Sequence, residues 1–380
     1  MPKFTHTLST SYEKPSFRAR SAEGMFDVPV KDKLSKSWDI NIPIENEDWS
    51  VGLIVGPSGS GKSVVARAAF PDAKLFDGSR HENWNSPCLL DDFAQTKLTL
   101  NDEGETVESD LEVTEITDAM SKVGFSSPPS WLLPFNALSN GQKFRTEIAR
   151  LILEAKPNEV IMIDEFTSVV DRKVAKVCSA AIQKMIRRSG KQMIAISCHY
   201  DIAEWLEPDW IYYADTGEFK ITRGVLRRPK IELTVLRVHH SAWRIFKDHH
   251  YLSGSIAKSA HCYVAYIGDE PVAFCAAIPF MHPKVKNMWR AHRTVCLPDY
   301  QGVGIGSALN DAVAQRFINM GKRYSGVASH PAMISHRMRS PNWKLTRKPG
   351  RVPPNGKTGK MKSSSNRITA SFEYIGEKND

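Results

Sequence analysis

Two patterns of apolar and polar residues alternate along this 380-residue chain. Short, uninterrupted apolar runs favour buried strands, and longer stretches with apolar residues every three to four positions favour helices. The clearest expected strands are residues 50–55, 159–163, 192–198, 261–266 and 271–277, and the clearest expected helices are 64–70, 143–153 and 307–320. Strands that alternate with helices in this way predict an α/β protein.

Composition narrows the class of protein. The length favours two or three domains, and 41% hydrophobic with 24% charged residues is typical of a globular protein. No apolar run approaches the roughly 20 residues of a membrane span, and residues 1–20 contain no apolar segment of a secretory signal. The six cysteines are widely spaced and form no CxxC pair. We therefore expect a cytoplasmic protein with no membrane partner, no disulfide framework and no zinc ribbon.

The charge is unevenly distributed. Residues 1–217 carry a net −8 and residues 218–380 a net +17, which together give the +9 of the whole chain. A mildly acidic first half and a strongly basic second half predict two functional parts, with an anionic partner for the second.

A glycine-rich segment in the first half has the residues that bind nucleotide phosphates. Residues 56–63 read Gly-Pro-Ser-Gly-Ser-Gly-Lys-Ser, between an expected strand and an expected helix, as the motif GxxxxGK[ST] requires. Its glycines let main-chain amides wrap a phosphate, the lysine reaches the β and γ phosphates, and the last serine ligates Mg²⁺. The expected ATP-binding residues are Gly56, Ser58, Gly59, Gly61, Lys62 and Ser63. An ordinary glycine turn is the alternative interpretation.

Two acidic residues end another expected strand. Asp164 and Glu165 follow the apolar run 159–163, a pattern in which one carboxylate holds Mg²⁺ and the next polarises a water. The same pair could simply mark the change from a buried strand to a solvated loop. Its occurrence with the phosphate loop favours a metal-binding Asp164 and a catalytic Glu165.

Three further segments resemble the ATP-binding cassette (ABC) ATPases. Leu138-Ser-Asn-Gly-Gln142 is similar to their LSGGQ signature, with Asn140 in place of a glycine, Ser168-Val-Val-Asp171 is similar to their D-loop, and His199 to their switch histidine. The resemblance covers about residues 24–217.

The resemblance implies a nucleotide sandwich. The phosphate loop of one subunit would face Ser139 and Gly141 of a second across ATP, with Glu165 as general base and His199 at the γ-phosphate. One cassette per chain then implies a homodimer. Gln95 is a candidate for the family's Q-loop glutamine, and either Phe26 or Trp38 could stack on the adenine.

A second phosphate-binding turn is expected in the basic half. Gln301-Gly-Val-Gly-Ile-Gly306 follows a strand and opens a helix, and it resembles the [RQ]xxGx[GA] turn of GNAT acyltransferases over about residues 233–376. The resemblance implies a mixed α/β acyltransferase domain that binds acetyl-CoA or another acyl-CoA. Glycines and a helix N-terminus suit its pyrophosphate. The expected contacts are Gln301, Gly302, Gly304 and Gly306.

The acyl-transfer residues are less clearly marked. Nine of twelve histidines lie between residues 239 and 336, which suits proton transfer or metal ligation, although any single one could be an ordinary surface residue. His250 and Tyr251 are the expected catalytic pair, because residues 246–254 form an unusual cluster of polar and aromatic groups. This segment also resembles the His-Tyr element of phage DNA-modifying Mom proteins, GNAT-like enzymes that act on adenine. The tyrosine acid common in the last GNAT helix is absent, and Tyr374 is either its substitute or a structural residue.

Residues 340–367 carry eight Lys or Arg and no Asp or Glu. We expect a flexible basic loop there, with Trp343 available for stacking on bases. Together with the +17 of the second half, this favours a nucleic-acid partner, either DNA or RNA. A charged segment that is merely solvated is the alternative.

The expected order is an N-terminal extension (1–23), an ABC-type ATPase domain (24–217), a linker (218–232) and a GNAT-like domain (233–376). This order resembles a fusion of an ABC ATPase with an acetyltransferase, and predicts an ATP-hydrolysing N-acyltransferase that modifies nucleic acid. Two alternatives stay open. One is an ATP-switched nucleic-acid-binding protein with a non-catalytic GNAT domain, and the other is an acyltransferase for a protein or a small amine.

Overall fold

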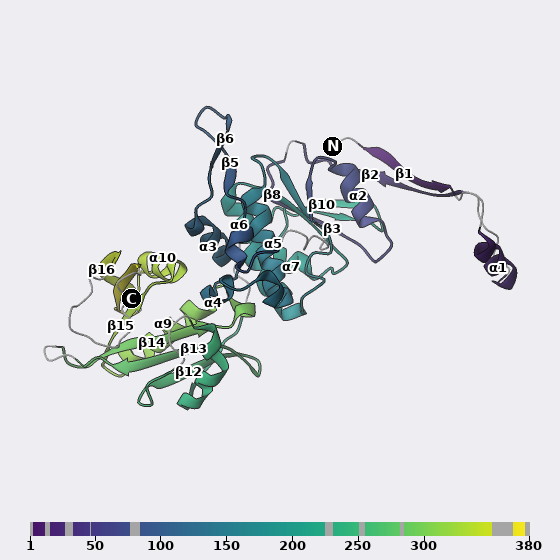
Figure 1. The fold of residues 1–380 in the computed structure, drawn as a ribbon. Helices are drawn as coiled ribbons and strands as arrows, with labels where there is room; N and C mark the ends of the chain where they lie inside the picture. The colour runs from purple at the N-terminus through teal and green to yellow at the C-terminus, as the bar shows by residue number, and fades with distance from the viewer. Residues whose placement is uncertain are drawn as a thin grey trace. The chain divides into compact units, whose positions relative to one another are not determined.

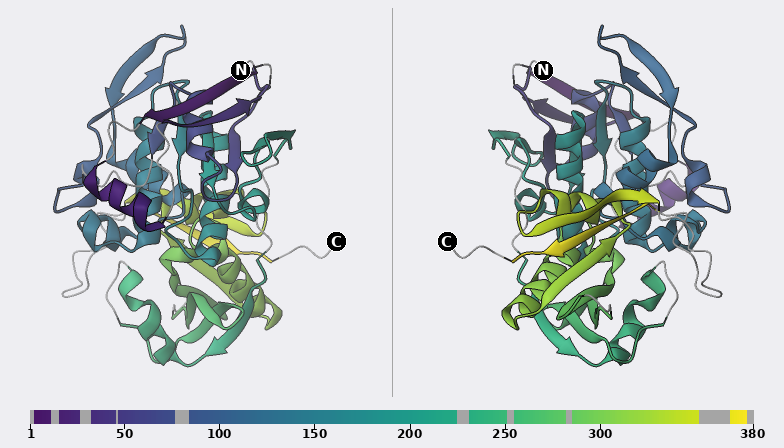
Figure 2. Two further views of the ribbon diagram at one scale, coloured as in Figure 1. Left: turned by 90° about the vertical axis from the view of Figure 1, so that its right-hand side faces the viewer. Right: turned by 90° about the vertical axis from the view of Figure 1, so that its left-hand side faces the viewer.

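The computed structural model describes residues 3–11, 16–26, 33–45, 47–76, 84–224, 231–250, 255–281, 285–351 and 368–376 (Figures 1 and 2). Its contacts form two compact units. Unit 1 comprises Met1–Arg80, Pro157–Ser168 and Ile186–Leu226, and unit 2 comprises His81–Lys156, Val169–Met185 and Arg227–Asp380. Each unit is therefore assembled from segments that are distant in sequence.

Unit 1 is built on a six-stranded sheet with the order β10-β9-β3-β8-β7-β4. Strands β3, β4, β7, β8 and β9 run parallel, and β10 pairs antiparallel with β9. The strands are β3 (Val51–Val55), β4 (Lys74–Phe76), β7 (Val160–Ile163), β8 (Gln192–Ser197), β9 (Trp210–Tyr213) and β10 (Glu218–Ile221). The central strands are apolar and buried on both faces, as parallel strands usually are.

The other elements of unit 1 are α1 (Phe17–Phe26), α2 (Lys62–Ala69), α7 (Ile202–Leu206) and a separate ribbon of β1 (Phe4–Ser11) and β2 (Lys33–Ile40), drawn in purple in Figure 1. Helix α6 (Arg172–Ser189) belongs to both units.

Unit 2 begins with a mainly helical segment. It contains η1 (Leu89–Asp92), the hairpin β5 (Thr96–Leu100) and β6 (Thr106–Asp110), α3 (Val113–Lys122), α4 (Pro128–Trp131), η2 (Phe135–Ala137) and α5 (Asn140–Glu154). Helix α3 packs against α5.

The rest of unit 2 is a seven-stranded sheet with the order β11-β12-β13-β14-β15-β17-β16, coloured green to yellow in Figure 2. Its strands are β11 (Thr234–Val238), β12 (His261–Ile267), β13 (Glu270–Pro279), β14 (Met288–Cys296), β15 (Arg323–Ala328), β16 (Trp343–Arg351) and β17 (Ile368–Tyr374). Its helices are η3 (His240–Ala242), α8 (Trp243–Phe246), η4 (Lys247–His249), η5 (Pro298–Tyr300), α9 (Ile305–Asn319) and α10 (Pro331–Arg339). Helix α9 contributes to the larger of two apolar clusters and α8 to the other.

Two sequence predictions for connecting segments were wrong. Residues 218–221, expected to begin the linker, form β10, because their main chain pairs with β9. Residues 343–351, expected in the flexible basic loop, form β16, which pairs antiparallel with β17. Residues 352–367 of that loop lie outside the described residues.

Trp343 also differs from expectation. It is only 5% exposed, and its indole N–H donates to Asp311 Oδ1 at 2.8 Å. Trp343 and Leu345 face inward while Lys344 and Thr346 are exposed, which is the alternation of a half-buried strand. The basic composition concealed this alternation, and Trp343 is not available for stacking on bases.

Candidate nucleotide and acyl-CoA sites

The glycine-rich loop of unit 1 leaves the carboxyl end of β3 and enters α2. Gly61 caps that helix with φ 97°, a left-handed conformation that favours glycine. Lys62 is 7% exposed, and its Nζ donates to Pro57 O at 3.0 Å. Ser60 Oγ is buried with no hydrogen-bond partner among the described residues. The loop thus brings a cation and an unsatisfied hydroxyl to one helix N-terminus, where an anion binds favourably.

Trp38 of β2 lies against this loop. Its indole N–H donates to Ser60 O at 2.8 Å, and a Cβ atom at Gly61 would collide with its ring. Lys36 Nζ donates to Gly59 O at 3.0 Å. Phe26, the other candidate for adenine stacking, is 71% exposed at the end of α1. The structure therefore places Trp38 beside the phosphate loop, a choice that the sequence left open.

Asp164, Glu165 and His199 follow strands that neighbour β3. Val55 pairs with Ser197, and Ala195 pairs with Ile163. Parallel strands end at the same edge of a sheet, about 4.8 Å from their neighbours. The start of the phosphate loop, the Asp164–Glu165 pair and the segment leading to His199 therefore share the carboxyl edge of three adjacent strands.

The acidic pair has an unusual main-chain conformation. Asp164 Oδ1 accepts the Glu165 N–H at 2.9 Å, and exposed Glu165 has φ 51°. A left-handed residue other than glycine is strained, and such strain is frequent at functional sites. His199 is half-buried, and its main-chain N–H donates to Ser197 Oγ at 3.2 Å.

The oxygen donors at this edge suit a hard cation. Mg²⁺ prefers oxygen ligands, and the Ser63 hydroxyl and the Asp164 carboxylate supply them. Within the described ranges, no group of three or more His, Cys, Asp or Glu side chains is arranged to hold a metal ion. The oxygen donors of Ser63 and Asp164 fit Mg²⁺.

The signature segment belongs to unit 2. Ser139 caps α5 by accepting the Gln142 N–H at 3.3 Å, while Gln142 Oε1 accepts the Ser139 N–H at 3.0 Å. This reciprocal capping leaves Ser139 exposed at the helix N-terminus. Gly141 is buried, and a Cβ atom there would lie 3.1 Å from Asp299 Oδ1.

The second glycine turn opens α9. Gly304 caps this 15-residue helix with φ 93°, and no described atom lies within 4 Å of the position a Cβ atom would take there. At Gly306 the nearest such atom is Cys296 Cβ, at 3.6 Å. Gly304 and Gly306 thus leave the helix N-terminus open to a ligand.

Gln301 and Gly302 are engaged within the protein. Gln301 is 8% exposed, its Nε2 donates to Cys296 O at 2.8 Å, and its Oε1 accepts the Ser126 N–H. A Cβ atom at Gly302 would lie 2.6 Å from Gly124 Cα. These two residues hold the turn in place.

Two family models match separate parts of the chain. Residues 41–168 match the ABC transporter family model, and residues 258–338 match the acetyltransferase (GNAT) domain model. The chain carries an ABC ATPase domain and a C-terminal GNAT acetyltransferase domain. The predicted mixed α/β fold class is confirmed.

Individual relatives are distant. The cytochrome c biogenesis ATP-binding export protein CcmA of Paramagnetospirillum magneticum is 28% identical over 171 residues, covering 40% of this chain and 75% of that protein. A bacterial ABC transporter cassette solved as a dimer is 17% identical, with a TM-score of 0.35, and the match covers 49% of this chain and 90% of that one. The ribosomal-protein-S18-alanine N-acetyltransferase of Escherichia coli is 13% identical, with a TM-score of 0.29, and the match covers 39% of this chain and 97% of that one.

The predicted acyl-transfer pair is only partly described. His250 is half-buried, with its ring centroid 5.7 Å from that of Trp243. Tyr251 lies outside the described residues. Tyr374 is 2% exposed, and its hydroxyl donates to Gln315 Oε1 at 3.1 Å, so it is a structural residue of the GNAT domain.

Sequence reasoning did not single out His292 of the GNAT domain. Ala276 pairs with Arg293 and Ala277 with Ala291, so His292 is the extra residue of a β-bulge in β14. Burial, followed by the charges of Arg293 and Arg290, lowers the pKa of His292 to about 4. A neutral imidazole at a bulge is a candidate proton acceptor. The one signal in the sequence was its place within the histidine-rich region.

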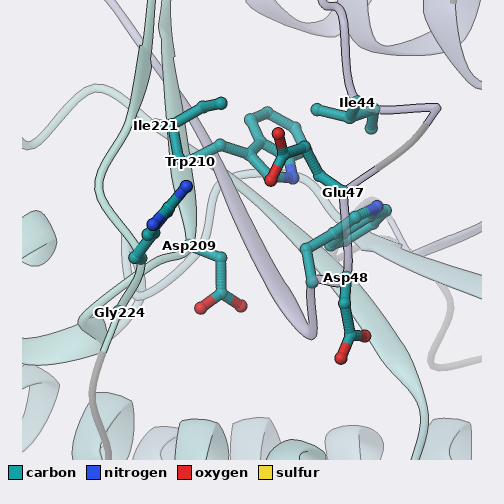
Figure 3. A pocket seen from close by; sticks show the side chains of 9 residues that line it. Ile44, Glu47, Asp48, Asp209, Trp210, Ile221 and Gly224 are labelled. Atoms are coloured by element: carbon teal, nitrogen blue, oxygen red, sulfur yellow. The ribbon is translucent and has the colours of Figure 1, made fainter.

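A cavity of about 320 Å³ in unit 1 lies away from the nucleotide chemistry (Figure 3). Trp49 and Asp209, at the amino ends of β3 and β9, help to line it. The carboxylate of Asp209 accepts the N–H groups of Ser50 and Val51 and pairs with Arg187 at 2.9 Å. The phosphate loop follows the opposite end of β3, so this cavity is not the nucleotide site.

No described helix is both long and apolar enough to cross a bilayer. The Q-loop candidate Gln95 is exposed, just before β5.

Proposed function

We propose that this protein is an ABC-type ATPase, acting as a homodimer, that is coupled to a CoA-dependent N-acyltransferase for nucleic acid. The observation that carries the ATPase part is the shared carboxyl edge of β3, β8 and β7, which carries both the phosphate loop and the acidic pair. The acyltransferase part is supported by the open helix N-terminus at Gly304.

The ATPase residues have separate tasks. Lys62 and the loop amides would hold the β and γ phosphates, and Ser63 with Asp164 would hold Mg²⁺, which neutralises phosphate charge when bound. Glu165 would accept a proton from the attacking water, and His199 would contact the γ-phosphate. Ser139 and Gly141 of a second copy would complete the site, because Ser139 is exposed at the N-terminus of α5.

Acyl transfer requires one proton acceptor. The acceptor amine would attack the thioester carbonyl, so that an N–C bond forms, the C–S bond breaks and CoA leaves as a thiol. The amine proton would pass to a neutral histidine, for which His250 and His292 are the candidates, and from there to the departing sulfur. The amides of the turn before α9 would bind the pyrophosphate of an acyl-CoA, most simply acetyl-CoA.

A basic edge strand supports a nucleic-acid acceptor. Strand β16 is the edge of the seven-stranded sheet, and four of its cations are exposed: Lys344, Arg347, Lys348 and Arg351. Such cations bind a phosphate backbone without base specificity.

The test is transfer of label from acetyl-CoA to DNA or tRNA, followed by nucleoside mass spectrometry. Wild type should label one of these polymers, and the His250→Ala or His292→Ala variant should lose the label. If neither polymer is labelled, the proposal fails, and label on a protein or a small amine would select that substrate class instead.

The second candidate is an ATP-switched nucleic-acid-binding protein with a non-catalytic GNAT domain. The absence of tyrosine from α10 favours it. Nucleic-acid binding that responds to ATP, without any acyl product, would support this candidate.

A further inference from the structure

The signature helix α5 packs against η5, the segment that leads into the turn proposed to bind acyl-CoA, and both belong to unit 2. Arg145 of α5, six residues after Ser139, is fully buried. Its Nη1 donates to Pro298 O at 2.9 Å and its Nη2 to Asp299 O at 3.3 Å. One buried guanidinium therefore ties the signature helix to η5, which leads into the GNAT turn.

Two glycines make a second connection. Gly124, after α3, and Gly302 both have positive φ, 93° and 88°. A Cβ atom at Gly124 would lie 2.8 Å from Gln301 O, and one at Gly302 would lie 2.6 Å from Gly124 Cα. Neither position has room for a side chain, so the two main chains are in direct contact.

Helix α6 makes a third connection. Val177 is 3% exposed in the same apolar cluster as Tyr300 and Ile305, the residues on either side of the turn. Lys173 Nζ also pairs with Glu270 at 2.8 Å, although this pair is exposed and contributes little. Well-packed interiors transmit displacements because they have no spare volume.

Asp299 brings charge to the signature residues. Its Oδ1 lies 3.7 Å from Arg145 Nη1 and faces Gly141. In the proposed sandwich, a nucleotide held by a second copy would bring its phosphate charge to Ser139 and Gly141. That charge would act on the loop containing Asp299, five residues before Gly304.

We propose that Arg145, Gly124 and Gly302 are positioning residues that couple the two sites. ATP engaged at Ser139 and Gly141 then changes the affinity of the same chain for CoA at Gly304, and CoA changes the affinity for ATP by the same factor. This inference rests on the proposed function.

The experiment measures CoA affinity in the full-length chain by calorimetry, with and without saturating Mg²⁺-ATP. A Glu165→Gln background keeps ATP intact. A coupled protein gives a ratio of the two CoA dissociation constants of about fivefold or more, in either direction, and ATP titrations with and without CoA give the same ratio. A ratio below fivefold overturns the inference.

Gly124→Ala tests the contact itself, because it adds one methyl group against the GNAT turn and changes neither proposed ligand site. In Gly124→Ala, the ratio of the CoA dissociation constants with and without ATP should fall to less than half of its value in the Glu165→Gln protein. The matched control is Gly321→Ala, where the backbone is also left-handed (φ 68°) but no described atom lies within 4 Å of the added Cβ, and it should keep the ratio of the Glu165→Gln protein. Equal ratios in the two variants overturn the inference.

A second variant keeps the inference testable if Gly124→Ala does not fold. Asp299→Asn adds no heavy atom and removes the charge between Arg145 and Gly141, so the ratio should move toward one, and an unchanged ratio overturns the inference. If ATP or CoA does not bind at all, or if Gly304→Glu does not weaken CoA binding, the proposed function fails and the inference fails with it. If both ligands bind and the ratio stays below fivefold, the inference alone fails.

Discussion

The indole N–H of Trp38 donates to the main-chain oxygen of Ser60 over 2.8 Å. An aromatic ring from β2 is thereby attached to the phosphate-binding loop, next to Gly61. Trp38 and Ser60 are 22 positions apart in the sequence, so the contact depends on how β2 lies against the phosphate loop.

Replacing Trp38 should weaken ATP binding. A base stacked on an aromatic ring contributes about 1–3 kcal/mol, so Trp38→Ala should raise the ATP dissociation constant about 5- to 150-fold. Trp38→Phe, which keeps a ring and loses the N–H donor, separates stacking from support of the loop. Phe26→Ala is the control, with no change expected in a fluorescence titration with labelled ATP. Equal affinities for Trp38→Ala and wild type would exclude the stacking role.

Glu165→Gln should separate ATP binding from hydrolysis. A general base contributes about 10²- to 10⁴-fold, so kcat should fall by that factor while ATP affinity is unchanged. Phosphate release and equilibrium binding measure the two quantities. Asp164→Asn should instead weaken binding that depends on Mg²⁺. A Glu165→Gln variant with wild-type turnover would assign the base elsewhere.

Arg145→Met should destabilise unit 2 strongly. A buried acceptor that loses its donor costs about 1–3 kcal/mol, and here the main-chain oxygens of both Pro298 and Asp299 lose the Arg145 guanidinium. Lys122→Ala is the control. Lys122 forms an exposed ion pair with Asp118, one helical turn away, so its loss should cost about 0.3–0.5 kcal/mol. Urea unfolding followed by tryptophan fluorescence compares them, and equal losses would contradict a buried role for Arg145.

His292 should make stability depend on pH. Its pKa is about 4 in the folded protein against the ordinary histidine pKa of 6.5, so between these values the unfolded chain binds more protons. Burial of His292 therefore leaves the free energy of unfolding unaffected above about pH 6.5 and lowers it as the pH falls toward 4. Urea midpoints from pH 7.5 to 4.5 should fall less steeply in His292→Gln than in wild type. Parallel curves would show that His292 is not buried as a neutral ring.

The exposed cations of β16 should set the salt dependence of nucleic-acid binding. Each lost phosphate contact on duplex DNA reduces the slope of log affinity against log salt by about 0.9. Three cations that can be replaced together by alanine are Lys344, Arg347 and Lys348. A control with equal charge loss replaces three exposed cations of the ATPase region, Lys122, Lys156 and Arg188. Equal slopes for both triple variants would show that β16 does not contact nucleic acid.

Local sequence was sufficient where one continuous segment contains its own chemistry. The predicted ends of the strand before the phosphate loop and of the helix after it lie within two residues of the ends of β3 and α2. The prediction succeeds because glycine conformation and helix N-termini are local properties. The same holds for the turn at Gly304 and α9. The roles of the individual site residues stay predictions, Tyr251 among them.

The sequence by itself determined the fold class and the two glycine turns, since these depend on residues a few positions apart. Only the tertiary structure decided that Arg145 reaches Asp299, which is 154 residues away, that His292 occupies a bulge and that Trp343 is buried. Such contacts depend on strand register and on which surfaces pack together, and hydrophobic patterning shows that a surface is buried without showing what covers it.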